Sequence, residues 1–269
     1  MSRLLLLALF LQASYGAERL ALIEGYAFVK VAVNGHAFRM LLDTGASSCA
    51  LTPEAARRAG LAYDHRVVVE TPAGNVVVPA ATAHVELGTH NLDAEILAQP
   101  LDGVRNVDSA ADGVLGQSFL GRFPVLIDYK NKRLLIGAEA EQQSGTLSSP
   151  VSAERVQGRM VVPVTLGDGK TWRLALDSGS ERLLLECGRG CPRLAGYPGD
   201  TTILTNAGER QAQTGVVKGV RIGPIALSRA ETLVITRTPA ADREDGLLPA
   251  HLFSVVYVDP ARNQVRFGK

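Results

Sequence analysis

The sequence contains two copies of one unit, and this duplication restricts the fold more than any other feature. "LLDTGASS" begins at Leu41 and "LALDSGSE" begins at Leu174. Each copy places an Asp inside an apolar run, directly before a hydroxyl residue and a Gly. The two Asp residues, Asp43 and Asp177, are 134 positions apart (177 − 43). A repeat at this spacing predicts two similar folding units in one chain.

Turn signals precede both Asp residues at the same spacing. Asn34-Gly35 and Asp168-Gly169 also differ by 134 positions. Asn-Gly and Asp-Gly are strong hairpin signals, because a two-residue turn needs positive φ at both central positions. Each copy is therefore predicted to begin with a β-hairpin whose second strand runs straight into the Asp turn.

The match continues downstream of both Asp residues. "TPAGN" at 71–75 answers "TNAGE" at 205–209, and "DGVLG" at 112–116 answers "DGLLP" at 245–249. The polar, Ser-rich stretch after the first copy is the natural connection between the two. The repeat divides the chain into a first lobe at 18–140, a linker at 141–156 and a second lobe at 157–269.

Composition narrows the class of protein. Of 269 residues, 46% are hydrophobic and 20% are charged, which is enough apolar material for two real cores. The formal net charge is +1 and no dense Lys/Arg stripe is present, so nucleic acid is not an expected partner. The 27 glycines and the frequent Val and Thr favour a mainly β protein with few short helices.

The first 17 residues are interpreted as a signal peptide. Arg3 is followed by the apolar run Leu4–Leu11 and then by small residues, with cleavage expected after Gly16 or Ala17. The run is too short to span a bilayer, and no later segment approaches that length. The mature chain is therefore predicted to have no membrane span and to be exported, either periplasmic or secreted.

Three cysteines are present. In an oxidising compartment Cys187 and Cys191 can close a small disulfide loop. Cys49 lies in an apolar run and is expected to be a buried free thiol. No His lies near the Cys pair, so no metal site is predicted. By contrast, "LTPEAARRAGL" after the first Asp predicts a short helix, with Thr52 as the N-cap and Gly60 as the terminator.

Two carboxylates brought together perform chemistry that one cannot. At about 3 Å separation they share one proton, so that one acts as a base and the other as an acid. A Gly after each Asp-hydroxyl pair lets the two turns approach closely, and the hydroxyls can hydrogen-bond across the contact. The predicted dyad is Asp43 with Asp177, and its support consists of Thr44, Gly45, Ser178, Gly179 and Ser180.

These motifs resemble the aspartic proteases of the retropepsin-like and pepsin-like group, and "DTGASSCALTPEAARRAGL" is similar to bacterial retropepsin-like members. The resemblance covers both halves of the mature chain. It implies a bilobal fold with one double-psi β-barrel-like lobe per copy, a cleft between the lobes, and one catalytic Asp from each. It further implies two flap-like hairpin tips that bind an extended peptide, formed by Thr71, Ala73 and Gly74 and by Thr205, Ala207 and Gly208.

The second copy departs from the pattern at two positions. Pro249 stands where the first copy has Gly116, and a Pro removes an N–H from the loop that supports the Asp turn. Ser180 stands where the first copy has Ala46. If the Ser180 hydroxyl donates to Asp177, the charged form of Asp177 is favoured and Asp43 holds the shared proton.

Other functional classes fit the sequence less well. A duplicated barrel that binds peptides without cleaving them is the main alternative, and Pro249 keeps it open. The Asp-x-Gly motifs superficially resemble the phosphate loops of actin-like kinases, but the segments between them are β-prone. "GQSFLG" at 116–121 has one residue too many for a serine-hydrolase elbow. The prediction is therefore a monomeric, exported aspartic endopeptidase that acts on peptides or proteins without a cofactor.

Overall fold

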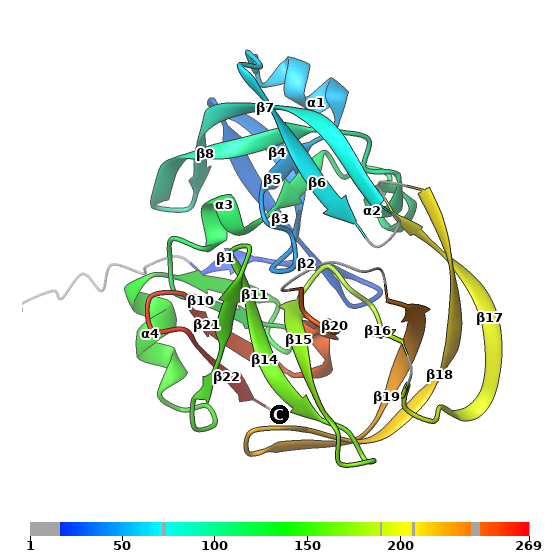
Figure 1. Ribbon diagram of the computed structural model, residues 1–269. Coiled ribbons are helices and arrows are strands. Elements are labelled where there is room, and N and C mark those ends of the chain that lie inside the picture. The colour runs from blue at the N-terminus through cyan, green and yellow to red at the C-terminus, as the bar shows by residue number, and fades with distance from the viewer. Residues whose placement is uncertain (1–16, 72–73, 189, 206–207, 238–242, 269) are drawn as a thin grey trace, which may run out of the picture.

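Three β-sheets make up most of the molecule (Figure 1). The structure, a computed structural model, describes residues 17–71, 74–188, 190–205, 208–237 and 243–268. Two of the sheets have eight strands and one has six. The predicted mainly β fold, with two duplicated lobes and few short helices, is confirmed.

The first lobe is an eight-stranded sheet that closes on itself. Its second strand also pairs with the long strand near the far edge, at Ala32↔Glu86 and Val33↔Val85, which brings the two ends of the sheet together. The strands in spatial order are β2 (Ala21–Ile23), β3 (Tyr26–Val33), β4 (His36–Leu42), β9 (Gly113–Leu115), β5 (Cys49–Leu51), β8 (His90–Ala98), β7 (Gly74–Leu87) and β6 (His65–Thr71).

The second lobe repeats this topology strand for strand. Its parallel pair starts at Leu174↔Gly246, where the first lobe has Met40↔Gly113, so the register is also repeated. The strands in spatial order are β13 (Glu154–Val156), β14 (Arg159–Thr165), β15 (Thr171–Asp177), β20 (Gly246–Pro249), β16 (Leu183–Cys187), β19 (Ile225–Thr236), β18 (Gly208–Ile222) and β17 (Ala195–Thr205).

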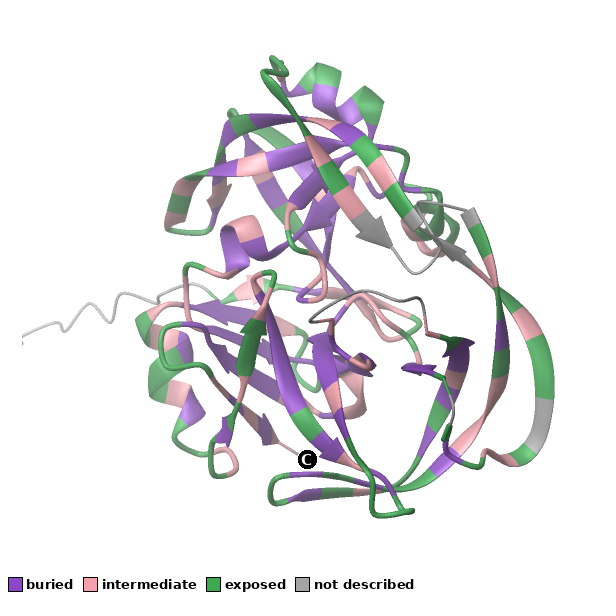
Figure 2. Ribbon diagram, in the orientation of Figure 1, coloured by how far each residue is buried: buried purple, intermediate pink, exposed green. Residues whose placement is uncertain are grey.

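A six-stranded sheet joins the two lobes. Its central pair is one strand from each copy, and both are largely buried (Figure 2). The strands in spatial order are β1 (Glu18–Arg19), β11 (Arg133–Ile136), β10 (Val125–Asp128), β21 (Val255–Asp259), β22 (Gln264–Gly268) and β12 (Val151–Ser152). The segment expected to link the copies holds the end of α4 (Ala138–Ser144), which packs on β10 and β11, together with β12 and β13.

Helices in the described residues are short. α1 (Pro53–Arg58) begins where the sequence predicts, because the Thr52 hydroxyl accepts from the Ala55 N–H at 3.2 Å. Gly60 follows its end with a φ of +65°. The other helical elements are α2 (Asp102–Val107), α3 (Gln117–Leu120) and the 3₁₀ turn η1 (Ala250–Leu252).

Only one of the two predicted dipeptide turns has the expected backbone. Asn34 and Gly35 have φ values of 49° and 78°, as a two-residue hairpin turn requires. In the second copy Gly169 has a φ of 82°, but Asp168 does not have a positive φ. The hairpin predicted there is present, because β14 and β15 pair antiparallel as far as Thr165↔Thr171, but its loop is longer than two residues and is closed by a hydrogen bond from the Leu166 N–H to the Lys170 carbonyl at 3.0 Å.

Candidate active site

The two Asp turns meet at the junction of the lobes and are held together by hydroxyl groups. Thr44 Oγ1 donates to the Leu176 carbonyl at 2.8 Å and accepts from the Ser178 N–H at 3.0 Å. In the opposite direction, Ser178 Oγ donates to the Leu42 carbonyl at 2.7 Å and accepts from the Thr44 N–H at 3.0 Å. All four residues are at most 3% exposed. These reciprocal bonds fix the two turns relative to each other without relying on exposed contacts.

Each glycine of the Asp turns packs directly against the carboxyl group of the other lobe. A Cβ at Gly45 would lie 2.5 Å from Cγ of Asp177, and a Cβ at Gly179 would lie 2.5 Å from Oδ2 of Asp43. No side chain larger than hydrogen fits at that distance without displacing a carboxyl group. The approach of the two Asp residues therefore depends on glycine at both positions.

The two carboxyl groups hydrogen-bond to each other but differ in their other partners. Asp43 Oδ1 accepts from the N–H groups of Gly45 at 2.8 Å and Ala46 at 2.9 Å. Asp177 Oδ1 accepts from the Gly179 N–H at 2.7 Å. Among the described residues, the turn thus gives two backbone donors to Asp43 and one to Asp177.

Burial raises the pKa of both carboxyl groups, because packed protein atoms from both lobes replace their hydration. Asp43 keeps some exposure to the cleft, whereas Asp177 is 6% exposed. The pKa of Asp177 is raised well above its usual value, first by burial and then by the negative charge of Asp43. The backbone donors to Asp43 favour its charged form. The shared proton therefore belongs on Asp177 and the charge on Asp43.

This assignment corrects the expectation built on Ser180. The Ser180 hydroxyl donates to the carbonyl of Arg182 at 2.9 Å and not to Asp177. The expected hydrogen bond is absent because the hydroxyl turns back toward its own loop. The difference between the two carboxyl groups arises instead at Ala46, whose backbone N–H supplies the second donor to Asp43.

Pro249 does not interrupt the strand beside the second Asp turn. β20 pairs with β15 as far as Asp177↔Pro249. In the first lobe a side chain at Gly116 would collide with the Ser48 carbonyl, at 2.4 Å. The two lobes differ after this strand, where α3 of the first lobe is replaced by η1 in the second.

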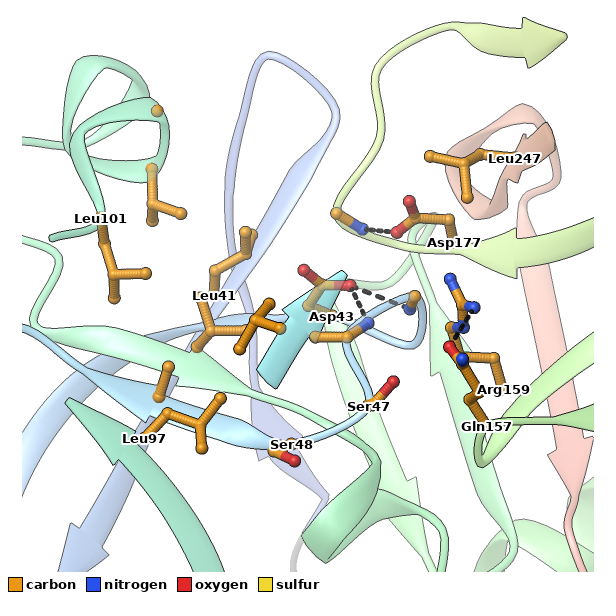
Figure 3. Close-up of a pocket in the computed structure, with 18 of the residues that line it drawn as sticks. Leu41, Asp43, Ser47, Ser48, Leu97, Leu101, Gln157, Arg159, Asp177 and Leu247 are labelled. Atoms are coloured by element: carbon orange, nitrogen blue, oxygen red, sulfur yellow. Dashed lines mark hydrogen bonds between the residues drawn. The ribbon is translucent and has the colours of Figure 1, made fainter. Parts of the chain in front are cut away.

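The dyad lies at the floor of a cleft with a volume of about 610 Å³ (Figure 3). On one side, the first lobe contributes a wall of apolar side chains, including Leu41, Leu97 and Leu101. On the other side, the second lobe contributes Arg159 and Gln157, which Figure 3 shows beside the carboxyl groups. The site is therefore enclosed by two chemically different walls.

The predicted flap residues lie at the ends of two long hairpins. Thr71 pairs with Gly74 between β6 and β7, and Thr205 pairs with Gly208 between β17 and β18. Ala73 and Ala207 lie outside the described residues. Three consecutive residues of β6, Val67, Val68 and Val69, line the cleft, whereas no described residue of β17 or β18 does. Of the two hairpins, only the first is therefore seen to line the cleft in the described part of the chain.

The three cysteines are in the states that the sequence predicts. Cys187, the last residue of β16, forms a disulfide with Cys191, and their Cα atoms are 5.5 Å apart. Cys49 is a buried free thiol, and burial raises its pKa. Within the described ranges, no group of three or more His, Cys, Asp or Glu side chains is arranged to hold a metal ion.

Sequence reasoning missed the charged side chains of the second wall. Arg159 Nη1 lies 2.8 Å from Glu244 Oε1, and Arg243 Nη2 lies 3.7 Å from Glu186 Oε1. All four residues line the cleft. One sequence feature could have indicated this wall: the Gln157-Gly158 pair forms a turn, with φ values of 49° and 83°, that places Arg159 at the start of β14.

The first lobe is similar to known aspartyl proteases. Residues 29–122 match a family model described as gag-polyprotein putative aspartyl protease. The matched segment starts within β3 and ends just after α3, so it contains Asp43 but not Asp177. No curated protein matches the sequence at a significant level. None of the helices in the described part of the chain has the length and apolar character needed to cross a bilayer.

Proposed function

We propose that the protein is an aspartic endopeptidase that uses Asp43 and Asp177 as a catalytic dyad. The observation that carries this proposal is the pair of hydrogen-bonded carboxyl groups at the floor of one cleft, with one group contributed by each lobe. The match of the first lobe to an aspartyl protease family supports it. A protein that only binds peptides would not need two buried carboxyl groups sharing one proton.

The different pKa values assign a role to each carboxyl group. Ionised Asp43 takes a proton from a water molecule as the water oxygen attacks the peptide carbonyl carbon, and Asp177 gives its proton to the carbonyl oxygen. Asp43 then passes its proton to the leaving nitrogen while one hydroxyl of the intermediate returns a proton to Asp177. The C–N bond breaks, and the dyad regains its starting protonation.

The cleft suits an extended peptide. β6 is the last strand of its sheet, so one of its backbone edges has no neighbouring strand among the described residues. Its residues Val67, Val68 and Val69 also line the cleft. An extended peptide placed over the dyad can pair with such an edge and direct alternate side chains into the two walls.

Export and a monomeric state are part of the same proposal. The first strand, β1, starts at Glu18, directly after the predicted cleavage positions Gly16 and Ala17. The disulfide after β16 is also typical of an oxidising compartment. Both copies of the Asp turn come from one chain, so the dyad forms without a second molecule. Mass spectrometry of the exported protein is expected to show a mature N-terminus at Ala17 or Glu18.

Peptide cleavage by purified mature protein tests the activity. Wild-type protein should cleave members of a peptide library at acidic to neutral pH, and a statine-containing inhibitor should block cleavage. Asp43→Asn and Asp177→Asn should each reduce cleavage at least about a thousandfold while leaving the far-UV circular dichroism spectrum unchanged. Full activity in either variant would show that the dyad is not the catalytic group.

A further inference from the structure

The two walls of the cleft differ in charge, and the repeat lets residues of the charged wall be compared with their counterparts in the first lobe. In each lobe a strand, β9 or β20, begins directly after an Asp whose carboxylate accepts from a backbone N–H of the hairpin that carries the catalytic Asp: Asp112 from Arg39 and Asp245 from Arg173. The residue before this Asp is alanine in the first lobe and Glu244 in the second. The duplicated backbone therefore places a carboxylate at the position where the first lobe has the buried Ala111.

The same comparison holds for one further position, that of Glu186. The Asp112 carbonyl accepts from the Thr52 N–H, and the Asp245 carbonyl accepts from the Glu186 N–H. Glu186 therefore takes the place of Thr52. Both lobes thus use the same backbone, and the charged wall is a property of the second-lobe side chains alone.

One ion pair of this wall is closed by direct contacts of both Arg159 Nη groups with Glu244. Arg159 donates to both oxygens of Glu244, at 2.8 and 3.0 Å, and also to Gln157 Oε1 at 3.0 Å. The two charged side chains are 11% and 4% exposed. A bidentate pair in this geometry is strong and directional, so both Nη groups of Arg159 and both oxygens of Glu244 are already engaged, and only the buried Arg159 Nε has no partner among the described residues.

The second ion pair is different, because its partners do not reach each other. Arg243 Nη2 and Glu186 Oε1 are 3.7 Å apart, beyond hydrogen-bond distance, although the side chains are only 11% and 7% exposed. Arg243 donates no side-chain hydrogen bond to any described residue, and its Nε is buried without a partner. Burial raises the pKa of Glu186. Polar groups removed from water without partners are unfavourable unless a ligand completes them.

The spacing and the charges of this pair define what fits between its members. A carboxylate would approach Arg243 but meet the negative charge of Glu186, and an ammonium group would meet the positive charge of Arg243. An aliphatic group would leave both without a partner. A carboxamide satisfies both, because its oxygen accepts from Arg243 and its nitrogen donates to Glu186.

We propose that the second-lobe wall is a subsite for a substrate side chain that ends in a carboxamide, Asn or Gln, held between Arg243 and Glu186. This inference rests on the proposed function, since it names the substrate class of that cleft. The apolar wall of the first lobe receives an aliphatic or aromatic side chain on the other side of the dyad. The protein thus cleaves between or near one apolar and one amide side chain.

The test uses four peptides that share an apolar residue on one side of the scissile bond and differ on the other side. The varied residue is Gln, Glu, Lys or Leu. Each peptide is also made with a reduced, non-cleavable bond, and its binding to the wild-type protein is measured by calorimetry. Hydrogen bonds to charged groups correspond to roughly ten- to a hundredfold in affinity, and we expect the Gln peptide to bind tighter than the other three by about this factor. Equal binding of the Leu and Gln peptides would overturn the proposal.

Two variants reverse the expected preference. Glu186→Gln leaves Arg243 without an opposing charge, so the Glu peptide should become the tightest ligand. Arg243→Gln removes the cation that acts most strongly on Glu186, and only the weaker effects of Arg210 and Arg237 remain, so the Lys peptide should become the tightest ligand. The matched control is Glu154→Gln, which removes an exposed ion pair to Arg173 on the same lobe and should leave the order unchanged. A variant that does not fold leaves the wild-type order as the deciding result.

The two proposals fail in different ways. If the cleavable peptides remain intact while the reduced peptides bind in the expected order, the subsite is correct and the protease activity is not. If the cleavable peptides are hydrolysed but Leu is preferred over Gln on both sides of the bond, the activity is correct and the subsite is not.

Discussion

The hydroxyl contact between the lobes gives the sharpest test of how the dyad is held. Thr44→Val keeps the shape of the side chain but replaces the hydroxyl with a methyl group. In the variant, the Leu176 carbonyl loses its donor and the Ser178 N–H loses its acceptor. Both residues are at most 2% exposed, so water cannot take the place of the hydroxyl without rearrangement of the lobe junction.

The expected loss of stability follows from these two groups. An unsatisfied buried backbone group costs about 1–3 kcal/mol, so two of them predict a loss of about 2–6 kcal/mol in the free energy of unfolding. Thr44→Ser is the matched control, because it keeps both hydrogen bonds and removes only a methyl group, worth about 1 kcal/mol. Domains are commonly stable by about 5–15 kcal/mol, so the Val variant should lose a large share of its stability and the Ser variant a small one.

Denaturant unfolding followed by fluorescence measures this difference. Trp172 is the single Trp of the chain and is buried in the second lobe, which contains both of the groups that lose a partner. The unfolding midpoint of Thr44→Val should fall clearly below that of Thr44→Ser. Peptide cleavage should fall in the same order, because the two turns position the dyad. Equal midpoints for the two variants would show that the hydroxyl does not hold the lobes together.

Three further outcomes follow from the dyad. The pH profile of kcat/KM should be bell-shaped, falling at low pH as Asp43 is protonated and at high pH as Asp177 loses its proton; a flat profile from acidic to neutral pH would contradict the assigned roles. The pKa of Asp177 is raised in the folded state, so the folded protein holds this proton more tightly than the unfolded chain does. The stability that protonated Asp177 contributes is therefore complete below its unfolded-state pKa and is lost as pH rises through its folded-state pKa. Asp177→Asn should therefore be more stable than wild type at neutral pH and nearly equal at acidic pH, and the same unfolding difference at both pH values would argue against a raised pKa. Gly179→Ala should lower activity at least about tenfold and stability by about 1–3 kcal/mol through the collision with Asp43, whereas Gly145→Ala, whose Cβ would meet only an atom 3.8 Å away, should change neither.

The duplication made much of the site predictable from the sequence. Two matching Asp turns in two matching units require a twofold-like arrangement, and this places Asp43 beside Asp177. The hydroxyl and glycine positions follow from the same pattern, because a close contact between two turns needs small residues and internal hydrogen bonds. The helix after Thr52 was predictable for a different reason, since its capping residues are local in the sequence.

Other features depend on contacts that the sequence does not display. The prediction for Ser180 was wrong because a hydroxyl has several acceptors within reach, and the conformation of its loop selects the Arg182 carbonyl. The six-stranded sheet pairs Val125 with Val258, residues from different copies that no local pattern connects. The charged wall was missed because Arg243 and Glu186 are far apart in the sequence and become neighbours only through the strand order of the second lobe.

Different parts of the cleft hold the dyad and contact the substrate side chains, but the two parts are not fully independent. The backbone and the hydroxyl contacts fix the dyad, and these are shared by both lobes, so the walls can change without moving Asp43 or Asp177. The charge of Arg159 nevertheless lowers the pKa of both carboxyl groups, partly offsetting the effect of burial. Glu244 neutralises that charge at short range, which limits the effect. A second lobe with an apolar wall like the first would therefore keep the geometry of the dyad but hold its protons to a higher pH. The charged wall consequently contributes both to the choice of substrate side chain and to the pH range in which one carboxyl group is ionised and the other is not.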